Sequence, residues 1–590
     1  MFSLLSSLGR AAADGLRGTF PDATLPDVIP VERSDRADLQ CTAALGLARA
    51  MRKNPREIAG ETAKALGAHP AVASCEVAGA GFVNVTLSTA WLGENLRAGL
   101  ALPAVGAGQT VVVDYSSPNV AKPMHIGHIR STILGEALKR VLRAVGYTVI
   151  ADNHLGDWGT QFGKLIVAWS RFRDDDAFAR EPVNELLRIY IRYGDEEKAQ
   201  RAALGQKAAA DEDGDAPAGD AVPEILAAAR AELVKLQQGD PANLALWQSF
   251  IDVSMKEFNR VYQRLGVSFD VTLGESFYNP VLADTVKKYC HAGVAEESEG
   301  AIVVTFSKDR DGEAMPPLLV RKRDGGFLYG TTDLATIDHR VKTWDPSRIL
   351  YVTDERQQLH FRQFFAAARR LGASVSLEHV WFGLMRLPEG TFSTRDGNVI
   401  GLEALLDEAE RRARALGAEV ATKSDTPFSD AELDEVARVV GLGAVKYNDL
   451  CKDRQTLVTF TWDKALALNG NSGPYLQYAY ARMRSILRKA AAQDAAPGTI
   501  ALAEPTERAL ALALQRYPMA VAEVARSARP HILCDQLYEV AQAFSTFYAA
   551  CPVLQSEPTV RASRLALVAI TADVLRAGLD LLGIETLERM

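Results

Sequence analysis

Long hydrophobic runs are missing from this chain of 590 residues, and no stretch approaches the roughly 20 apolar residues that a membrane-spanning helix needs. The opening MFSLLSSLGRAAADGL is weakly apolar and lacks the basic start of a secretory signal. We therefore expect a cytoplasmic protein without membrane contact, whose first helix is amphipathic.

Cysteine is also scarce, and its spacing excludes the usual metal and disulfide frameworks. The chain contains no C-x-x-C pair, and its six cysteines are widely separated: Cys41, Cys75, Cys290, Cys451, Cys534 and Cys551. We expect reduced, mostly buried thiols and no zinc site or other metal site of the protein's own.

An excess of positive charge is absent as well, because 66 basic residues face 74 acidic ones and leave a net charge of −8. Any nucleic-acid site must therefore be a local basic surface. The hydrophobic fraction of 48% is sufficient for several cores, and the length indicates three or four domains.

The patterning divides the chain into three parts. Residues 1–104 alternate Ala-rich helical stretches with the strand-like VASCEVAGAGFVNVTLS and predict a small α+β domain. Residues 107–461 predict a Rossmann-like α/β domain with insertions at roughly 178–310, and residues 462–590 predict an all-α helical bundle. The predicted strands of the α/β domain are Val111–Val113, YTVIAD (147–152), SRILYVTD (347–354) and HVWFGLM (379–385).

Two segments within the α/β part differ from this pattern. AIVVTF (301–306) and LLVRKRDGGFLYG (318–330) predict a hairpin. Residues 206–222 are acidic and rich in Ala, Gly and Pro, which indicates a mobile surface linker.

The most specific motif is His125-Ile126-Gly127-His128, which follows the strand 111–113 and opens a predicted amphipathic helix. A helix N-terminus at the carboxyl end of a parallel strand offers unpaired N–H groups to phosphates. Imidazoles can donate to phosphate oxygens, and Gly127 lets a base or ribose approach the backbone. The motif predicts a nucleotide site, and the alternative is that the histidines merely cap the helix or fill the core.

The tetrapeptide resembles the HIGH signature of class I aminoacyl-tRNA synthetases, and SSPNVAKPMHIGHIRST is similar to its arginyl-tRNA synthetase version. The segment TFSTRDGN (391–398) is by itself an ordinary surface turn, but its position resembles that of the KMSKS loop. Thr391 and Thr394 then stand where two lysines are usual. The resemblance implies that Lys122, just before the first signature, supplies the missing cation.

The resemblance also implies an arginine pocket. A carboxylate accepts two parallel N–H bonds from a guanidinium, and the resemblance gives this task to Asp333 together with Tyr329. From the residues alone, Asp333 would more simply cap a helix after two threonines. The other residues expected to bind the amino acid are Asp114, suited to its α-ammonium group, with Asn119, His154 and Gln357.

The last 130 residues resemble the helical anticodon-binding domain of the same family. QYAYARMRS and FSTFYAACPVL carry aromatic residues at helical spacing, which are more often core than RNA platforms. The alternative is that Tyr480 stacks on an anticodon base. Four cations are expected to face phosphates: Arg482, Arg484, Arg488 and Lys489.

Together these features predict a monomeric arginine–tRNA ligase that uses ATP, as its Mg²⁺ complex, L-arginine and tRNA(Arg), with the first domain on the tRNA body. His125, His128 and Lys122 are the expected catalytic residues, and the two histidines with Gly127, Thr394 and Arg395 are expected to bind ATP. A cysteinyl enzyme would need zinc ligands, and a glutamyl enzyme would need cations where Asp333 stands. A small-molecule nucleotidyltransferase would not need the outer domains, and a non-enzymatic RNA-binding protein would not need the two signatures.

Overall fold

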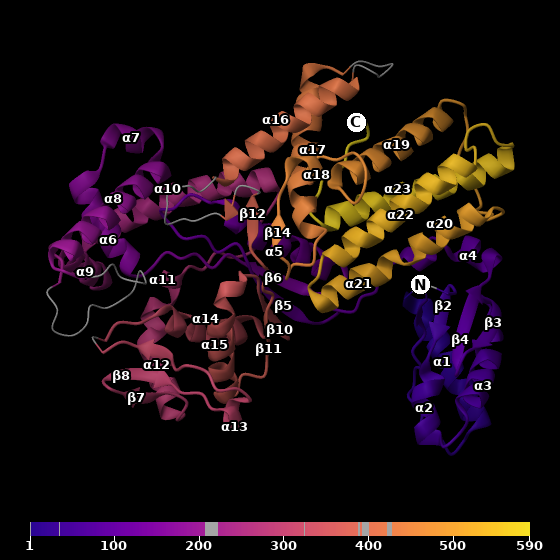
Figure 1. Cartoon of the computed structure of the whole chain (residues 1–590), viewed down its shortest axis with the longest axis horizontal. Helices are drawn as coiled ribbons and strands as arrows, with labels where there is room; N and C mark the ends of the chain where they lie inside the picture. The colour runs from indigo at the N-terminus through magenta and orange to yellow at the C-terminus, as the bar shows by residue number, and fades with distance from the viewer. Residues whose placement is uncertain are drawn as a thin grey trace.

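The computed structural model describes residues 2–34, 36–206, 222–323, 325–387, 390–391, 401–421 and 428–590. Most of the expected linker at 206–222 lies outside these residues. A small N-terminal domain stands apart from a central α/β domain, which has inserted helices on one side and a helical bundle on the other (Figure 1). Within the described ranges, no helix combines the length and apolar character needed to cross a membrane.

The N-terminal domain is built on an antiparallel sheet with the strand order β1-β2-β4-β3. The strand-like stretch predicted around residues 72–87 forms two of these strands, and Ala78 pairs with Phe82 where they turn. The domain has its own core, which includes Leu8, Ile58 and Val85. Its elements are α1 (Phe2–Thr19), β1 (Glu32–Arg33), β2 (Leu39–Cys41), α2 (Ala43–Met51), α3 (Pro55–Gly67), β3 (Val72–Ala78), β4 (Phe82–Leu87) and α4 (Thr89–Asn95).

The central sheet consists of four parallel strands in the order β11-β10-β5-β6. From β5 the chain first adds β6 on one side and later returns to add β10 on the other. The direction of the crossovers therefore reverses between β5 and β10, which is where open parallel sheets bind their ligands. The strands are β5 (Thr110–Asp114), β6 (Thr148–Asp152), β10 (Arg348–Tyr351) and β11 (Ser376–His379).

One strand prediction is wrong. The apolar stretch 379–385 is not a strand of this sheet, because β11 ends at His379 and the chain then leaves it. Met385 begins β12 (Met385–Leu387), which pairs instead with β14 (Val458–Thr459). Phe382 is buried, and the guanidinium carbon of Arg130 lies 5.4 Å from the centroid of its ring. The hydrophobicity of this stretch thus reflects burial rather than strand pairing.

Helix α5 (Ile126–Ala144), which the HIGH-like motif opens, is buried on nearly every side. The expected amphipathic helix does not turn its polar side chains to solvent, since Arg130, Glu136 and Lys139 are 1%, 4% and 3% exposed. Helices α16 (Leu402–Ala421), α17 (Asp430–Leu450), α21 (Tyr517–Ser527) and α23 (Pro558–Leu581) contact it.

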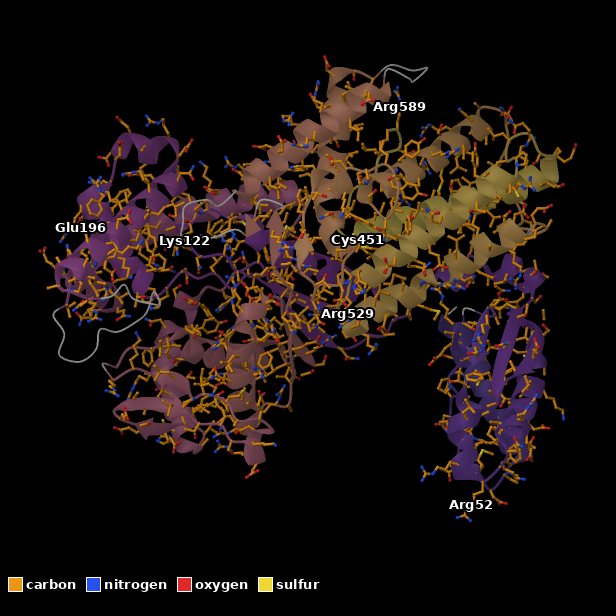
Figure 2. All side chains as sticks on the ribbon, viewed as in Figure 1. Arg52, Lys122, Glu196, Cys451, Arg529 and Arg589 are labelled. Atoms are coloured by element: carbon orange, nitrogen blue, oxygen red, sulfur yellow. The ribbon has the colours of Figure 1, made fainter. Side chains whose placement is uncertain are left out.

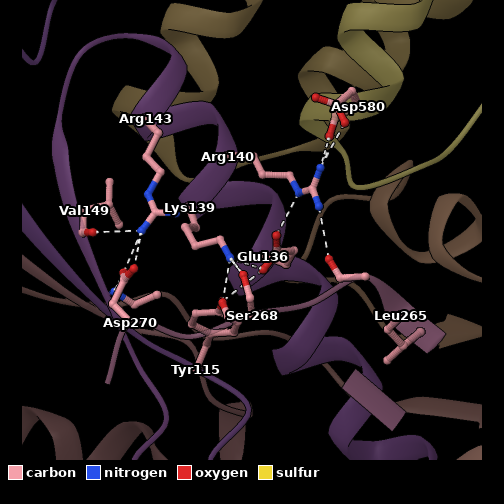
Figure 3. A network of polar contacts seen from close by, with 12 residues as sticks. Tyr115, Glu136, Lys139, Arg140, Arg143, Val149, Leu265, Ser268, Asp270 and Asp580 are labelled. Carbon is pink, nitrogen blue, oxygen red and sulfur yellow. Dashed lines mark hydrogen bonds and ion pairs between the residues drawn. The ribbon is translucent and has the colours of Figure 1, made fainter. Parts of the chain in front are cut away.

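Glu136 is the centre of the polar contacts that hold α5 in place (Figure 3). Its carboxylate accepts a hydrogen bond from the Tyr115 hydroxyl at 3.1 Å and pairs with Lys139 at 2.6 Å and Arg140 at 2.7 Å. Arg140 also reaches Asp580 of α23 at 3.0 Å. Buried charges are tolerated when they are paired, and here the pairs join α5 to the loop after β5 and to the helical bundle.

The insertions form two separate units. Helices lie on one side: α6 (Thr160–Phe172), α7 (Asp175–Arg180), α8 (Pro182–Ala203), α9 (Glu224–Gln237) and α10 (Pro241–Leu265). The predicted hairpin is confirmed, because β8 (Ala301–Val304) pairs antiparallel with β9 (Leu318–Arg321), and β7 (Glu296–Ser298) completes that sheet.

The C-terminal part is helical, as predicted, and it shares one hydrophobic core with the α/β domain. That core runs from Val113 and Ile129 through Tyr447 to Leu537 and Leu575. The expected fold class is confirmed: an N-terminal α+β domain, a Rossmann-like α/β domain with insertions, and an all-α bundle. The main helices of the C-terminal bundle are α19 (Gly473–Ala491), α20 (Pro505–Gln515), α21, α22 (His531–Ala550) and α23.

A pair of glycine substitutions tests how tightly α5 is held. A Cβ on Gly135 would lie 2.1 Å from Cγ of Tyr115, whose hydroxyl is already fixed by Glu136, so Gly135→Ala should destabilise the fold by ~1–3 kcal/mol. Gly60 in α3 has no atom within 4 Å of such a Cβ, and Gly60→Ala should stabilise it by up to ~1 kcal/mol. Denaturant unfolding of both variants provides the measurement, and equal effects would contradict the packing described.

Candidate functional site

The carboxyl ends of three neighbouring strands form the floor of the site. Tyr351, Asp114 and Asp152 are the last residues of β10, β5 and β6, and the register pairs Tyr351 with Asp114 and Asp114 with Asp152. All three side chains are buried. The floor lies at the point of reversal between β5 and β10, where the Ser131 hydroxyl of α5 donates to the carbonyl of Val352 at 2.6 Å.

The two histidines of the motif cap α5. Nδ1 of His125 accepts a hydrogen bond from the amide N–H of Gly127 at 3.0 Å, and Nδ1 of His128 accepts one from the amide N–H of His125 at 3.1 Å. The ring centroids are 4.0 Å apart. The capping interpretation is thus correct as geometry. It does not exclude a functional role, because each ring uses only one of its two nitrogens for the cap.

These hydrogen bonds also determine the form of both rings. A nitrogen that accepts an N–H bond carries no proton, so in the neutral rings the proton sits on Nε2. Burial, with the charges of Arg356 and Lys122, lowers the pKa of His125 to about 4. Burial and the neighbouring His125 lower the pKa of His128 to about 3. At neutral pH both side chains are therefore uncharged rings that offer an Nε2–H donor.

Gly127 is needed for the cap itself. A Cβ at this position would lie 2.7 Å from Cε1 and 2.9 Å from Nδ1 of His125. Any larger residue would displace the His125 ring from its hydrogen bond. The cap is thus a second reason for glycine at this position, besides the predicted approach of a ligand to the backbone.

Two cations lie beside the motif, and sequence reasoning identified only one. Lys122 lies where the α/β domain meets the inserted helices (Figure 2), with Nζ 4.7 Å from the ring centroid of Tyr190 in α8. Arg356, from η3 (Glu355–Gln357) after β10, acts on the pKa of His125 more strongly than Lys122 does. Its position directly after a parallel strand was the signal that could have revealed it.

Helix α14 (Tyr329–Trp344) brings the expected guanidinium readers to the same side of the sheet. Its N-cap residue is Leu328, so the alternative that Asp333 caps this helix is wrong. Oδ2 of Asp333 lies 2.5 Å from Nε2 of His360 in α15 (Gln358–Arg370). The ring centroids of Tyr329 and His360 are 4.6 Å apart, and the Tyr329 side chain is at the surface.

The same helix carries a residue that sequence reasoning missed. Arg340 is fully buried, and its Nη2 lies 2.7 Å from Oδ2 of Asp114 and 2.7 Å from Oδ2 of Asp152. Its guanidinium carbon is 5.2 Å from the ring centroid of Tyr351. Asp114, expected to face a substrate ammonium group, is thus already paired with a cation of the protein.

The remaining expected residues are more dispersed. Asn119 is exposed in the loop after β5, where it bridges to Gly156, and Gln357 is exposed in η3. His154 is partly buried, and its ring centroid is 5.7 Å from that of Tyr278 in α11 (Glu275–Tyr278). Thr394 and Arg395 lie outside the described residues, so their expected place at the nucleotide stays a prediction.

One alternative for the bundle is wrong. Tyr480 is 3% exposed and its hydroxyl donates to Glu588 at 3.2 Å, so it cannot stack on an RNA base. Arg484 and Arg488 also pair with Glu588, at 2.7 Å and 3.4 Å. The C-terminal segment folds back over α19, and its Glu588 contacts all three side chains. Arg482 and Lys489 are exposed.

In the part of the chain that the structure describes, no group of three or more His, Cys, Asp or Glu side chains is arranged to hold a metal ion. The absence of zinc stays a prediction.

The low histidine pKa values predict a pH dependence of stability. Because the folded-state pKa of His125, about 4, lies below its unfolded value near 6.5, the unfolded chain binds more protons between these limits. Stability should therefore fall as pH decreases from about 6.5 to about 4. Asn also caps helices but does not titrate, so His125→Asn should weaken this dependence in thermal melts. His291 is exposed, and His291→Asn should leave it unchanged. The same pH slope in His125→Asn as in the parent would contradict the assignment.

Comparison with known proteins agrees with this geometry. Residues 94–462 match the family described as tRNA synthetases class I (R), catalytic domain, residues 476–590 match the DALR anticodon binding domain, and residues 7–87 match the arginyl tRNA synthetase N terminal domain. The chain is 40% identical over 579 residues to an arginine–tRNA ligase of Fusobacterium nucleatum, with 97% of each chain covered. It is 43% identical over 610 residues to one of Frankia casuarinae, with 100% of this chain and 99% of that relative covered.

Solved structures show the same architecture. The arginyl-tRNA synthetase of Thermus thermophilus superimposes with a TM-score of 0.79 at 25% identity, covering 100% of both chains. That of Plasmodium falciparum has the same fold, with a TM-score of 0.81 at 24% identity, covering 100% of this chain and 99% of that one. With a catalytic-domain match over more than half of its length and full-length relatives at 40% identity and above, this chain belongs to the arginyl-tRNA synthetase family.

Proposed function

We propose that His125, His128 and Lys122 serve the activation step of an arginine–tRNA ligase, the reaction that membership of this family assigns to the chain. ATP, as its Mg²⁺ complex, and L-arginine form arginyl-adenylate and pyrophosphate, and arginine then passes to the 3′ end of tRNA(Arg). The observation that carries the proposal is the pair of neutral imidazoles at the N-terminus of α5, each with an Nε2–H donor.

The chemistry needs positioning and charge stabilisation rather than a covalent enzyme intermediate. The arginine carboxylate attacks the α-phosphorus in line with the departing pyrophosphate, and negative charge grows on the phosphate oxygens. Nε2–H donors and the positive end of the α5 dipole stabilise that charge without reorganising. Lys122 is proposed to neutralise the leaving group, with Arg356 as a second cation nearby. Gly127, Thr394 and Arg395 are further proposed ATP contacts.

Arginine is proposed to lie along α14 and over the strand ends. Asp333, oriented by His360, accepts the guanidinium, and Tyr329 closes the mouth of the pocket. Asp114 receives the α-ammonium group. The proposed contacts to the rest of the amino acid are Asn119, His154 and Gln357.

We propose that tRNA contacts the two outer parts, with the body on residues 1–104 and the anticodon on residues 462–590, on either side of a catalytic part at 107–461. Arg482 and Lys489 stay candidate phosphate contacts because they are exposed. The bundle shares its core with α5, so a deletion from Asn469 would expose that core, and point variants are the better test. A monomeric state and a cytoplasmic location stay predictions.

His125→Asn separates the capping role of this residue from catalysis. Asn keeps a cap acceptor for the Gly127 amide but loses the Nε2–H donor, so the melting temperature should stay close to that of the parent. The rate of arginine-dependent pyrophosphate exchange should fall by about a hundredfold or more, the usual cost of one transition-state donor. A folded variant with near-normal exchange would rule out a catalytic role for this ring.

Lys122→Met tests the proposed substitute for the missing loop lysines. The rate of activation should fall by about a hundredfold, with a much smaller change in ATP affinity, because the cation acts mainly on the departing pyrophosphate. Lys287, a surface lysine paired with Asp284 at 2.9 Å, provides the matched control Lys287→Met, which should be neutral. If ATP affinity and the activation rate fell equally in Lys122→Met, Lys122 would stabilise bound ATP as much as the transition state, and it would not assist the chemical step specifically.

A further inference from the structure

Helix α14 carries a row of polar residues that leads from the surface to the floor of the proposed arginine site. Tyr329, Asp333, Thr336 and Arg340 follow one another at intervals of four, three and four residues, so they share one face of the helix. Tyr329 is 56% exposed, the Asp333 side chain 22% and Arg340 0%. The burial of this face increases steadily toward the strand ends.

At the buried end of this row, Arg340 joins the ends of the three neighbouring strands β10, β5 and β6. Its Nη2 lies 2.7 Å from one carboxylate oxygen of Asp114 at the end of β5 and 2.7 Å from one of Asp152 at the end of β6. Its guanidinium stacks on Tyr351 at the end of β10. Asp114 and Asp152 are direct register partners, so their carboxylates are neighbours on adjacent strands.

Two neighbouring buried carboxylates repel each other, and without a cation beside them the pair is driven to share one proton. Burial raises the pKa of Asp152, and the charge of Asp114 adds to this rise, while Arg340 opposes it. Asp114 keeps one oxygen, Oδ1, on the side of Ser117, whose hydroxyl donates to it at 3.0 Å. The cluster of two carboxylates and one guanidinium has a net charge of −1.

We propose that Arg340 is a positioning residue for the amino-acid substrate: it keeps Asp114 and Asp152 ionised together, so that Asp114 presents a negative charge to the ammonium group of arginine. The inference rests on the proposed role of Asp114 in binding that group. Although Arg340 is itself a cation in a pocket for a cationic substrate, its role in this proposal is to keep the neighbouring carboxylates negatively charged.

The other titratable groups that face this cluster come from every element around it. They are His154 after β6, Tyr278 of α11, Asp333 and His339 of α14, and Tyr351 of β10. Arg340 is the one permanent cation in this group, since Arg stays protonated at every pH at which the fold exists. Without Arg340, the charge on Asp114 and Asp152 should therefore depend on whether the two carboxylates hold a shared proton, and so on pH.

Arg340→Met provides the direct test, through KM values in arginine-dependent pyrophosphate exchange. We expect the KM for arginine to rise about tenfold or more at pH 7 and the KM for ATP to change less than about twofold. Between about pH 6 and 8 the variant's KM for arginine should fall as the shared proton is lost, while that of the parent stays flat. Arg340→Lys keeps the charge but loses the planar guanidinium over Tyr351, so its KM for arginine should lie between those of the parent and Arg340→Met. A KM for arginine near the parental value in folded Arg340→Met, or one without pH dependence, overturns the inference.

The double variant Arg340→Met/Asp152→Asn covers the case in which the single variant does not fold. It removes the cation and one carboxylate together, so Asp114 no longer has a competitor for its charge. We expect its KM for arginine to return to within about threefold of the parent and to lose the pH dependence. A tenfold increase that persists in the folded double variant would overturn the inference.

Two further variants complete the design. Arg564 is a buried arginine that pairs with Glu507 at 2.7 Å inside the bundle, and Arg564→Met should lower the melting temperature without changing the KM for arginine. Asp114→Asn separates the two hypotheses. An unchanged KM for arginine in Asp114→Asn removes the proposed role of Asp114. A raised KM there, together with an unchanged one in Arg340→Met, overturns only the inference about Arg340.

Discussion

The structure depends on the burial of α5, which places its N-terminus over the ends of the parallel strands. Most of the helix is covered, by the sheet on one side and by α16, α17, α21 and α23 on the other. Its buried charges have partners in three other parts of the chain: Glu136 accepts a hydrogen bond from Tyr115, Lys139 donates to the carbonyl of Ser268, and Arg130 pairs with Asp449 of α17 at 2.7 Å. A helix held in this way can keep two uncharged imidazoles in fixed positions, because any tilt would break several buried ion pairs at once.

Burial affects the two sides of the site differently. At the nucleotide side it removes charge, since the low pKa values of His125 and His128 make both rings neutral donors. At the strand ends it acts in the opposite direction on an acid: burial raises the pKa of Asp152, and Arg340, which pairs with both Asp114 and Asp152, opposes that rise. Neutral donors suit phosphate oxygens on which charge develops, and a net negative cluster suits a cationic amino acid.

The shared core explains how the helical bundle and the central domain form one unit. Tyr447 of α17, close to the HIGH-like helix, bonds Asn471 and the carbonyl of Cys534 in the bundle, at 2.6 Å and 3.1 Å. The C-terminal segment adds Glu585, which pairs with Arg438 of α17 at 2.7 Å. The N-terminal domain, by contrast, has its own core and is joined to the bundle through contacts such as Arg508 with Asp38 at 2.5 Å.

The sequence by itself determined the class of fold and the location of the nucleotide motif. Alternating strand and helix patterns identify the parallel sheet because hydrophobic period follows secondary structure, and His125-Ile126-Gly127-His128 is specific enough to mark a helix N-terminus. Only the tertiary structure decided what surrounds those elements. Asp152 is 188 residues away from Arg340 in the chain, and the two meet through strand register and the packing of α14, which no local pattern encodes. The same reason applies to α5 and to Tyr480: a polar face predicts exposure only until another part of the chain packs on it and pairs its charges.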